Sequence, residues 1–330
     1  MLKKIMSILL GAAMLLCAAA CESTGANSSA GSTTTSGRIK IVTTVFAEYD
    51  WVREIAGTHT QEMELIYLPK NGVDMHSYQP SVDDMINISD CTMFIYVGGE
   101  SDGWVEDAVS RASNKNMKVL CLMDILGESA KTEEHKEGMQ GEEEKTTDEE
   151  PEYDEHVWLS LRNAALFCKS IETALSEIDP GNAADYAANT QKYLEELDTL
   201  DKSFADLFSQ NKPTLIFADR FPFRYFTDDY GIDYFAAFSG CSAETEASFE
   251  TLAFLTAKVT EIGCHTIYTI EGSDQSLANT IIRNANTADI SVAELNSIQS
   301  VSEAQITDGA SYLGIMQQNY KVLSASTSSR

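Results

Sequence analysis

The sequence predicts an α/β protein with two doubly wound lobes, each containing a parallel sheet, joined by one long spine helix. Short apolar segments rich in β-branched residues alternate with amphipathic segments, and this alternation occurs twice. A long helical pattern separates the two runs. Strands that alternate with helices of this length form parallel sheets covered on both faces. The 330 residues provide enough chain for two such lobes.

The first half of the chain contains four short apolar segments that predict strands. They are 39–45, 63–68, 91–97 and 118–122. Amphipathic segments between and after them predict helices at 46–57, 80–89, 103–112 and 161–177. The first lobe is therefore expected to cover 38–178, with an acidic loop at 127–155.

A single long helix is predicted within the linking segment 179–212. After the turn Asp179-Pro180-Gly181, no Gly or Pro occurs until Pro213. Apolar residues recur there at helical spacing: Tyr186, Tyr193, Leu197, Leu200, Phe204 and Leu207. About 29 residues at 1.5 Å each span roughly 43 Å, long enough to run along both lobes as a stiff spine.

The second half repeats the pattern of the first. Its predicted strands are 214–218, 233–238, 266–270 and 291–295. The predicted helices are 248–262, 274–286 and 309–324. The second lobe is expected to cover 213–330.

The N-terminus predicts export. A basic start precedes an apolar stretch, and three Ala residues lead to Cys21, which resembles a bacterial lipoprotein processing site. The resemblance implies a signal peptide at 1–20 and lipidation of Cys21. The small polar residues of 21–37 predict a flexible tether. We therefore expect an exported protein, lipid-anchored to the outer face of the bacterial cytoplasmic membrane, on the periplasmic side where an outer membrane exists.

Composition excludes two classes of protein. The formal net charge is −28, whereas a nucleic-acid binder needs a basic face for phosphate contacts. The N-terminal apolar run is the only long one, which excludes a multi-span membrane protein. The five cysteines beyond Cys21 are odd in number and show no framework, so buried free thiols are expected, and a Cys241–Cys264 bridge stays open.

The segment from Glu128 to Glu155 is strongly acidic. It holds thirteen acidic residues, three lysines and His135. This composition predicts a solvated, disordered insertion. Clustered carboxylates and His135 also offer ligands for weak capture of divalent cations, and the two interpretations are compatible.

Two histidines lie in distinctive motifs. His76 lies in Gly72-Val-Asp-Met-His-Ser-Tyr-Gln-Pro80, and His156 lies in Asp154-Glu-His-Val-Trp-Leu159 at the end of the acidic segment. With the later segment around Tyr225, these motifs resemble the zinc- and manganese-binding solute-binding lipoproteins of bacterial ABC importers (cluster A-I, family 9). The resemblance covers roughly residues 38 to 325.

The resemblance implies that His76 and His156 are the first two metal ligands, and that the ion is the transported cargo. It implies an ABC permease and its ATPase as membrane partners, a monomeric binding protein and no catalysis. Ligands from both lobes would couple metal binding to a small closure about the spine helix.

The second lobe departs from the family pattern. The third ligand position falls on Arg220, which cannot bind a metal, and the fourth falls on Asn296, a weaker oxygen donor. Open α/β sheets bind ligands beyond the carboxyl ends of their strands, where Asp219 and Glu271 fall. These two acids are therefore the candidates to complete the site. Asp219 pairing with Arg220 or Arg224, and Glu271 capping a helix, are the structural alternatives.

Zinc is the expected ion, and manganese stays open. Two imidazoles with one or two carboxylates suit tetrahedral zinc, whereas manganese accepts more oxygen ligands. A zinc hydrolase is the first alternative, but the chain has no His-Glu-x-x-His or Gly-x-Ser-x-Gly motif, so no enzyme is expected. The second alternative is an adhesin, or a binder of an organic or anionic solute, whose metal site has decayed at Arg220.

Overall fold

The computed structural model describes residues 38–140, 152–209, 212–242, 246–285 and 289–328. Residues 38–330 form one compact unit. The predicted signal peptide, the tether and Cys21 lie outside the described residues. None of the described helices is long and apolar enough to cross a membrane.

The first sheet contains four parallel strands in the order β2-β1-β3-β4. They are β1 (Ile39–Thr43), β2 (Met63–Tyr67), β3 (Met93–Tyr96) and β4 (Lys118–Cys121). Neighbouring residues Ile41 and Val42 are both fully buried, but they belong to different core clusters. Side chains alternate between the two faces of a strand, so both faces of this sheet are covered.

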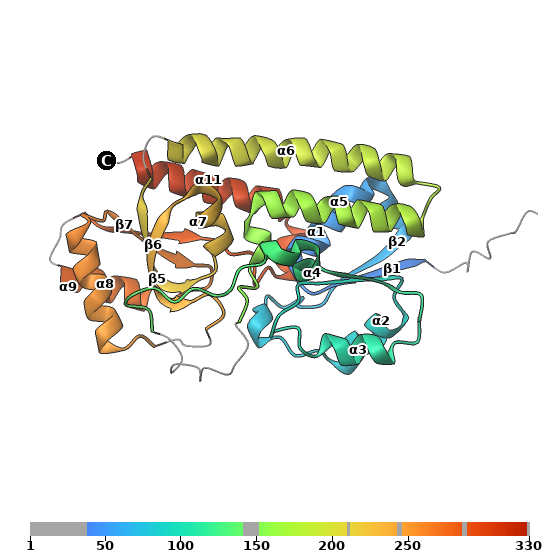
Figure 1. Ribbon diagram of the computed structural model, residues 1–330, viewed down its shortest axis with the longest axis horizontal. Coiled ribbons are helices and arrows are strands. Elements are labelled where there is room, and N and C mark those ends of the chain that lie inside the picture. Colours follow the sequence, from blue (N-terminus) through green and yellow to red (C-terminus); the bar gives the residue numbers. More distant parts are fainter. Residues whose placement is uncertain (1–37, 141–151, 210–211, 243–245, 286–288, 329–330) are drawn as a thin grey trace, which may run out of the picture. The chain divides into compact units, whose positions relative to one another are not determined.

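Helices pack on the two faces of the first sheet. They are α1 (Phe46–Ala56), α2 (Val82–Asp90), α3 (Val105–Arg111), α4 (Leu122–Leu126) and α5 (Leu161–Ile178). Figure 1 shows α2 and α3 on one side of β1 and β2, with α1 and α5 on the other. Ser81 and Ser160 begin α2 and α5 by accepting hydrogen bonds from backbone amides of the first turn.

The second sheet repeats this arrangement, with the order β6-β5-β7-β8 and all neighbours parallel. Its strands are β5 (Thr214–Phe221), β6 (Asp233–Ser239), β7 (Thr266–Ile270) and β8 (Ser291–Leu295). The helices of this half are α7 (Arg224–Tyr230), α8 (Phe249–Glu261), α9 (Ser276–Ala285), α10 (Glu303–Thr307) and α11 (Tyr312–Ser328). The register of β5 with β6 shifts between Phe217 and Arg220, which re-aims the side chains at the carboxyl end of β5.

The spine helix is α6 (Ala183–Ser209), whose 27 residues span roughly 40 Å. It contacts α1 and α5 of the first half, and α7 and α11 of the second (Figure 1). Its buried stripe follows the predicted spacing, except that Phe208 rather than Leu207 is buried in the last turn.

The C-terminal helix α11 joins the two halves a second time. It contacts β8, but it also contacts α1. Tyr312 at its start donates its backbone N–H to Asp50 (2.6 Å) and its hydroxyl to the carbonyl of Trp158 (2.6 Å). One core cluster accordingly includes residues of both sheets, among them Ile41 and Phe217. The lobe boundaries at 38–178, 179–212 and 213–330 remain predictions.

The prediction of a disordered acidic insertion is wrong for its first part, residues 130–140, which we call the strap. Gln140 pairs with Phe238 of the edge strand β6, with Gln140 N donating to Ala237 O (2.8 Å). The hydroxyl of Tyr234 donates to Glu134 (2.8 Å), and Lys136 forms an ion pair with Asp233. An edge strand offers unpaired backbone groups, which composition alone does not reveal. Residues 141–151 lie outside the described residues.

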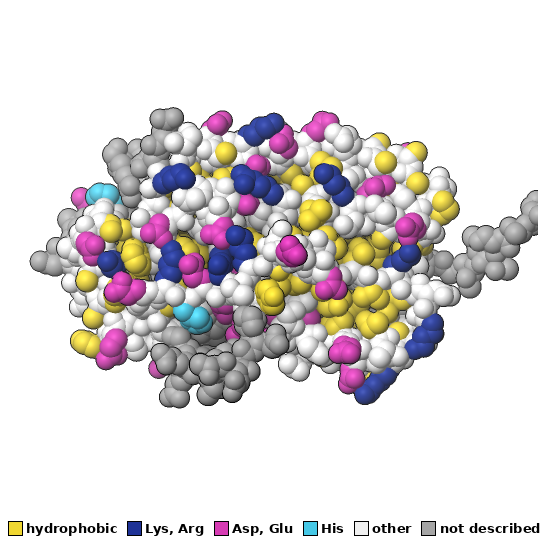
Figure 2. All heavy atoms as spheres, in the orientation of Figure 1, with side chains coloured by type: hydrophobic (Ala, Val, Ile, Leu, Met, Phe, Trp, Pro, Cys, Tyr) yellow, Lys and Arg dark blue, Asp and Glu magenta, His cyan; other side chains and the backbone are white. Residues whose placement is uncertain are grey.

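Charged side chains are mixed over the face drawn in Figure 2. Its described Lys and Arg side chains lie among Asp and Glu side chains rather than in one continuous basic area. His135 of the strap is exposed.

Candidate metal centre

His76 is presented by a single helical turn after β2. This 3-10 turn, Met75–Ser77, is anchored by the buried side chain of Met75. The carboxylate of Asp74 accepts the backbone N–H of His76 (3.0 Å), which fixes the start of the turn. Nδ1 of the imidazole lies 2.8 Å from the hydroxyl of Ser101 and 3.5 Å from a carboxylate oxygen of Glu155.

His156 is held by the same local device. The carboxylate of Asp154 accepts its backbone N–H (2.9 Å) and lies 3.0 Å from its Nδ1. The residues that follow, Val157–Leu159, are fully buried, and Trp158 donates its indole N–H to the carbonyl of Ser297 (2.9 Å). The imidazole of His156 is itself fully buried, so neither its position nor its ring orientation is free to vary.

The two imidazoles face one another through Nε2, and these atoms are 3.1 Å apart. Because Nδ1 of each ring faces an oxygen, Nε2 is the nitrogen that each ring directs into the shared space, as in histidine metal ligands. Two nitrogens on one tetrahedral zinc, each at 2.0–2.1 Å, would be about 3.3 Å apart. The observed spacing therefore already fits a shared metal ion.

The protonation of the pair follows from its surroundings. Burial, with the neighbouring His156, lowers the pKa of His76 to about 3, so this ring is neutral at pH 7. Burial also acts to lower the pKa of His156, but Asp154, Glu155 and Glu133 outweigh it and raise that pKa above 6.5. Without a metal, His156 can donate its Nε2–H to Nε2 of His76. A cation would take the place of that proton.

Buried carboxyl groups lie in this region, and burial makes their ionised forms unfavourable in the absence of a cation. Burial raises the pKa of Glu155 above its ordinary value and that of Asp102 to about 7. Oε1 of Glu155 accepts the backbone N–H of Ser101 (2.8 Å). Its Oε2 is buried and accepts no hydrogen bond from the described residues. A bound cation would compensate these charges, so the residues present suit a metal ion.

The second half closes over the histidines with backbone and with Arg220. A guanidinium nitrogen of Arg220, near the end of β5, lies 2.5 Å from the carboxylate of Asp74. Gly240 follows β6, and a side chain there would place its Cβ 3.0 Å from Cε1 of His156. Gln299, with its amide nitrogen 3.2 Å from Asp74, places its oxygen 3.2 Å from Nε2 of His156.

Asp219 and Glu271 line the same 480 Å³ cavity as His76 and Arg220. Asp219 accepts the backbone N–H of Arg220 (2.9 Å), and its other oxygen lies 3.4 Å from Ile270 N. Glu271 accepts from Ser297 N (2.7 Å), from the Ser297 hydroxyl (2.7 Å) and from Gln299 N (3.2 Å).

The structure does not bring Asp219 or Glu271 into the histidine cluster. Glu271 supports the loop after β8 rather than a helix start. Asn296 is also engaged, since its side-chain oxygen accepts Ile298 N (2.8 Å).

A residue that the sequence analysis missed joins the two histidines. Among the described residues, one group of three potential ligand side chains has all its ligand atoms within 4.8 Å of one another: His76, His156 and Cys241. Cys241 follows the carboxyl end of β6, where the edge rule that selected Asp219 and Glu271 would also have found it.

The open possibility of a Cys241–Cys264 bridge is not realised. Cys264 precedes β7, whereas Cys241 follows β6. In a parallel sheet these positions lie at opposite edges, which explains why the two do not meet.

Comparison with known proteins decides the family. The family model for the periplasmic component A of the zinc-uptake complex (ZnuA) matches residues 41–326. The chain belongs to this family.

Relatives agree with that assignment. Over 295 residues the chain is 30% identical to the zinc-binding lipoprotein AdcA of Streptococcus pneumoniae R6, covering 88% of this chain and 56% of AdcA. The chain thus spans about half the length of the AdcA relatives it matches. It is 27% identical to the high-affinity zinc uptake system protein ZnuA of Bacillus subtilis, covering 98% of both chains.

Solved structures share the fold. The Zn(II)-bound ZnuA-like domain of S. pneumoniae AdcA matches with a TM-score of 0.69 at 28% identity, covering 88% of this chain and 99% of that domain. The periplasmic zinc-binding protein TroA of Treponema pallidum matches with a TM-score of 0.70 at 22% identity, covering 88% and 99%. These comparisons confirm the predicted family and the two-sheet α/β fold.

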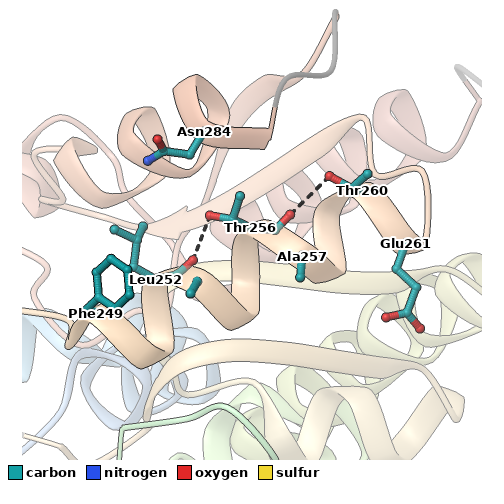
Figure 3. A pocket seen from close by; sticks show the side chains of 8 residues that line it. Phe249, Leu252, Thr256, Ala257, Thr260, Glu261 and Asn284 are labelled. Carbon is teal, nitrogen blue, oxygen red and sulfur yellow. Dashed lines mark hydrogen bonds between the residues drawn. The ribbon is translucent and has the colours of Figure 1, made fainter.

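Elsewhere in this ZnuA-family chain, a larger pocket of 670 Å³ lies along α8 beside α9. Figure 3 shows mainly apolar and Thr side chains there, with Glu261 at one end. The hydroxyls of Thr256 and Thr260 donate back to carbonyls of α8 (2.7 and 3.3 Å). With one carboxylate and no imidazole, this pocket lacks a set of metal ligands.

Proposed function

We propose that this protein captures Zn²⁺ outside the cytoplasm and delivers it to an ABC permease driven by its ATPase. The observation that carries the proposal is the pair of Nε2 atoms 3.1 Å apart, with each ring oriented by an oxygen at Nδ1. The ion is cargo, so the site has to bind it and release it, and no enzymatic step is proposed. Membership in the ZnuA family supports a role in transport.

Zinc is proposed rather than manganese because imidazole nitrogens dominate the preformed part of the site. The zinc-binding name of AdcA and the Zn(II)-bound structure of its ZnuA-like domain support the same ion. His76 and His156 are the proposed ligands. Asp219 and Glu271 remain proposed for the second half, and Asp219 is the better placed because one of its oxygens is held only by a 3.4 Å contact.

The proposed location follows the N-terminal motif. Cys21 would carry the lipid, and residues 21–37 would tether the body to the outer face of the membrane. A monomer in this position would present the loaded site to the permease. Family membership and the lipoprotein name of AdcA support this arrangement.

Metal analysis tests the function. Residues 38–330, which form one compact unit, would be stripped with a chelator and dialysed against a mixture of zinc and manganese. We expect about one zinc per chain. A His76→Ala/His156→Ala double variant should lose at least about 100-fold in zinc affinity, because two ligands are removed.

His265→Ala is the matched control, since His265 is exposed and distant in the fold from the cluster. It should retain the parental zinc content. A parent that binds no metal would contradict the proposal and favour the organic or anionic solute. Manganese in place of zinc would retain the transport role and change its cargo.

A further inference from the structure

Among the Cys, His, Asp and Glu side chains of the described second half, Cys241 is the one that lies close to both histidines. His76 and His156 both come from the first half. His76 lies in the turn after β2, and His156 directly follows the acidic segment. Cys241 follows β6 of the second sheet. Its sulfur and the imidazole nitrogens lie within 4.8 Å of one another, whereas Asp219 and Glu271 are outside this group.

We propose that Cys241 is the third zinc ligand and takes over the role that the family pattern places at Arg220. This inference rests on the proposed zinc-binding function and adds a sulfur donor to it. The resulting set has two imidazoles and one thiolate, with a fourth position open for water or a second-half oxygen. Cys241 would thereby determine the specificity of the site.

The backbone around Cys241 is fixed close to the histidines. Cys241 donates its N–H to the Glu133 carboxylate of the strap (2.8 Å), and Ser242 N lies 3.4 Å from Ser239 O. Gly240 lies so close to His156 that its missing side chain is what permits the approach. The loop that carries the thiol is therefore held from three sides: by β6, by the strap and by the ring of His156.

The other second-half candidates are already engaged. Arg220 forms its ion pair with Asp74, and Glu271 accepts four hydrogen bonds from the loop after β8. Recruiting Glu271 would leave buried amides without acceptors, which is unfavourable for each lost partner. The Cys241 thiol interacts with the backbone of Glu155, the neighbour of His156, so its side chain already faces the histidine segment.

The chemistry of sulfur matches the geometry. With Zn–N near 2.05 Å and Zn–S near 2.3 Å, a tetrahedral ion would place sulfur about 3.5 Å from each nitrogen. The cluster, whose ligand atoms lie within 4.8 Å of one another, would contract to these spacings on binding the ion. On binding, the zinc–nitrogen and zinc–sulfur bonds form, and the Nε2 proton of His156 and the thiol proton leave to solvent. The ion and the thiolate together then contribute one positive charge beside Asp154 and Glu155.

A thiolate also changes which ion the site prefers. Soft sulfur ligands favour zinc, whereas manganese prefers carboxylate, carbonyl and water oxygens. A two-imidazole, one-thiolate site would therefore reject manganese more strongly than a site completed by Asp219. Because the sulfur comes from the second half and the nitrogens from the first, one ion would also hold the two halves together.

Cobalt substitution tests the inference directly. Residues 38–330 would be loaded with Co²⁺, which gives a near-ultraviolet charge-transfer band only when a thiolate is bound. We expect this band in the parent and in Cys121→Ser, whose thiol belongs to β4. Cys241→Ser should lose the band, bind zinc at least about 10-fold more weakly and discriminate less against manganese.

The outcomes separate this inference from the proposed function. One zinc per chain with no cobalt band in the parent, or an unchanged band in Cys241→Ser, would overturn the role of Cys241 and leave zinc binding intact. No zinc in the parent would overturn both. If Cys241→Ser fails to fold, alkylation of the unmodified protein decides: zinc should protect Cys241 from iodoacetamide, and equal labelling with and without zinc contradicts the inference.

Discussion

The candidate metal centre has two walls, one formed by His76 and His156 of the first half and one by Cys241 and Arg220 of the second, and they are built in different ways. On the first-half wall, His76 and His156 each follow an Asp by two residues, and that Asp accepts the histidine's own backbone N–H (3.0 and 2.9 Å). The geometry of each ligand is therefore encoded within a few residues. On the second-half wall, Cys241 is positioned by Glu133, which is 108 residues away in sequence.

This difference explains why the sequence predicted the first-half candidate ligands, His76 and His156, but not Cys241. In an Asp-x-His motif the Asp orients the histidine, so one short motif predicts both the candidate ligand and the residue that orients it. The second-half positions that the family pattern supplies are occupied by Arg220 and Asn296, and both side chains serve the protein's own contacts. The proposed ligand Cys241 is positioned by tertiary structure rather than by a motif.

Removing the local support of the first wall should have the largest effect. Asp154→Asn leaves His156 in place but takes away the carboxylate that faces its Nδ1. We expect zinc affinity to fall about 10- to 100-fold, because second-shell partners set the tautomer and basicity of a histidine ligand. Isothermal titration with zinc measures the change.

Asp84→Asn is the control for that measurement, since Asp84 caps α2 and its carboxylate contacts Ser81 and Tyr78. Its zinc affinity should match the parent. Equal affinities for Asp154→Asn and the parent would show that the first wall does not depend on its local carboxylate.

Removing the hydrogen bond that positions Cys241 should lower zinc affinity less than Asp154→Asn does. Glu133→Ala removes the acceptor of Cys241 N and leaves the thiol present. One hydrogen bond contributes about 0.5–1.5 kcal/mol, so zinc affinity should fall roughly 2- to 12-fold. Glu134→Ala is the control. It removes the hydrogen bond from Tyr234 and leaves the contact of Glu133 with Cys241, so this variant should bind zinc like the parent. If Glu134→Ala weakened zinc binding more than Glu133→Ala, another residue of the strap would position Cys241.

The fold was predictable because its signals are local and repeated. All eight strands, their parallel pairing and the spine helix α6 follow from apolar runs and helical spacing. The helices α4, α7 and α10 were not predicted, since their five to seven residues leave few positions for a periodic pattern; α3, also of seven residues, was predicted within 103–112. The docking of α11 on α1 was also missed, since it depends on contacts such as Tyr312 with Asp50, which are 262 residues apart.

The strap shows the limit of composition. Its acidic residues predict disorder, yet Gln140 pairs with the edge strand β6, and Lys131 and Lys136 form ion pairs with Asp228 and Asp233. Average charge does not record that a few lysines are placed to meet acids on the neighbouring surface. The proximity of Cys241 to the histidines has a related cause: it depends on contacts between residues far apart in sequence, such as Cys241 with Glu133.

Arg220 provides the smallest and most discriminating change. Its ion pair with Asp74 joins the two walls, and both side chains are about one-fifth exposed. Exposed pairs contribute about 1 kcal/mol or less, and removing one partner of a fully buried pair costs about 3–5 kcal/mol. Because about four-fifths of each side chain is buried, Arg220→Met should lower the free energy of unfolding by an amount between these limits. Denaturant unfolding of Arg220→Met, Asp74→Asn and the double variant gives the coupling energy of the pair.

Zinc affinities of the same variants show whether Arg220 only joins the two walls or itself binds a ligand. If Arg220 only joins the walls, Arg220→Met should change zinc affinity by less than about threefold, the equivalent of 0.7 kcal/mol. Sulfate or phosphate should then stabilise the parent no more than the variant. If either anion stabilised the parent but not Arg220→Met, Arg220 would be an anion-binding group. The second wall would then bind an anion, whereas the first binds the metal ion.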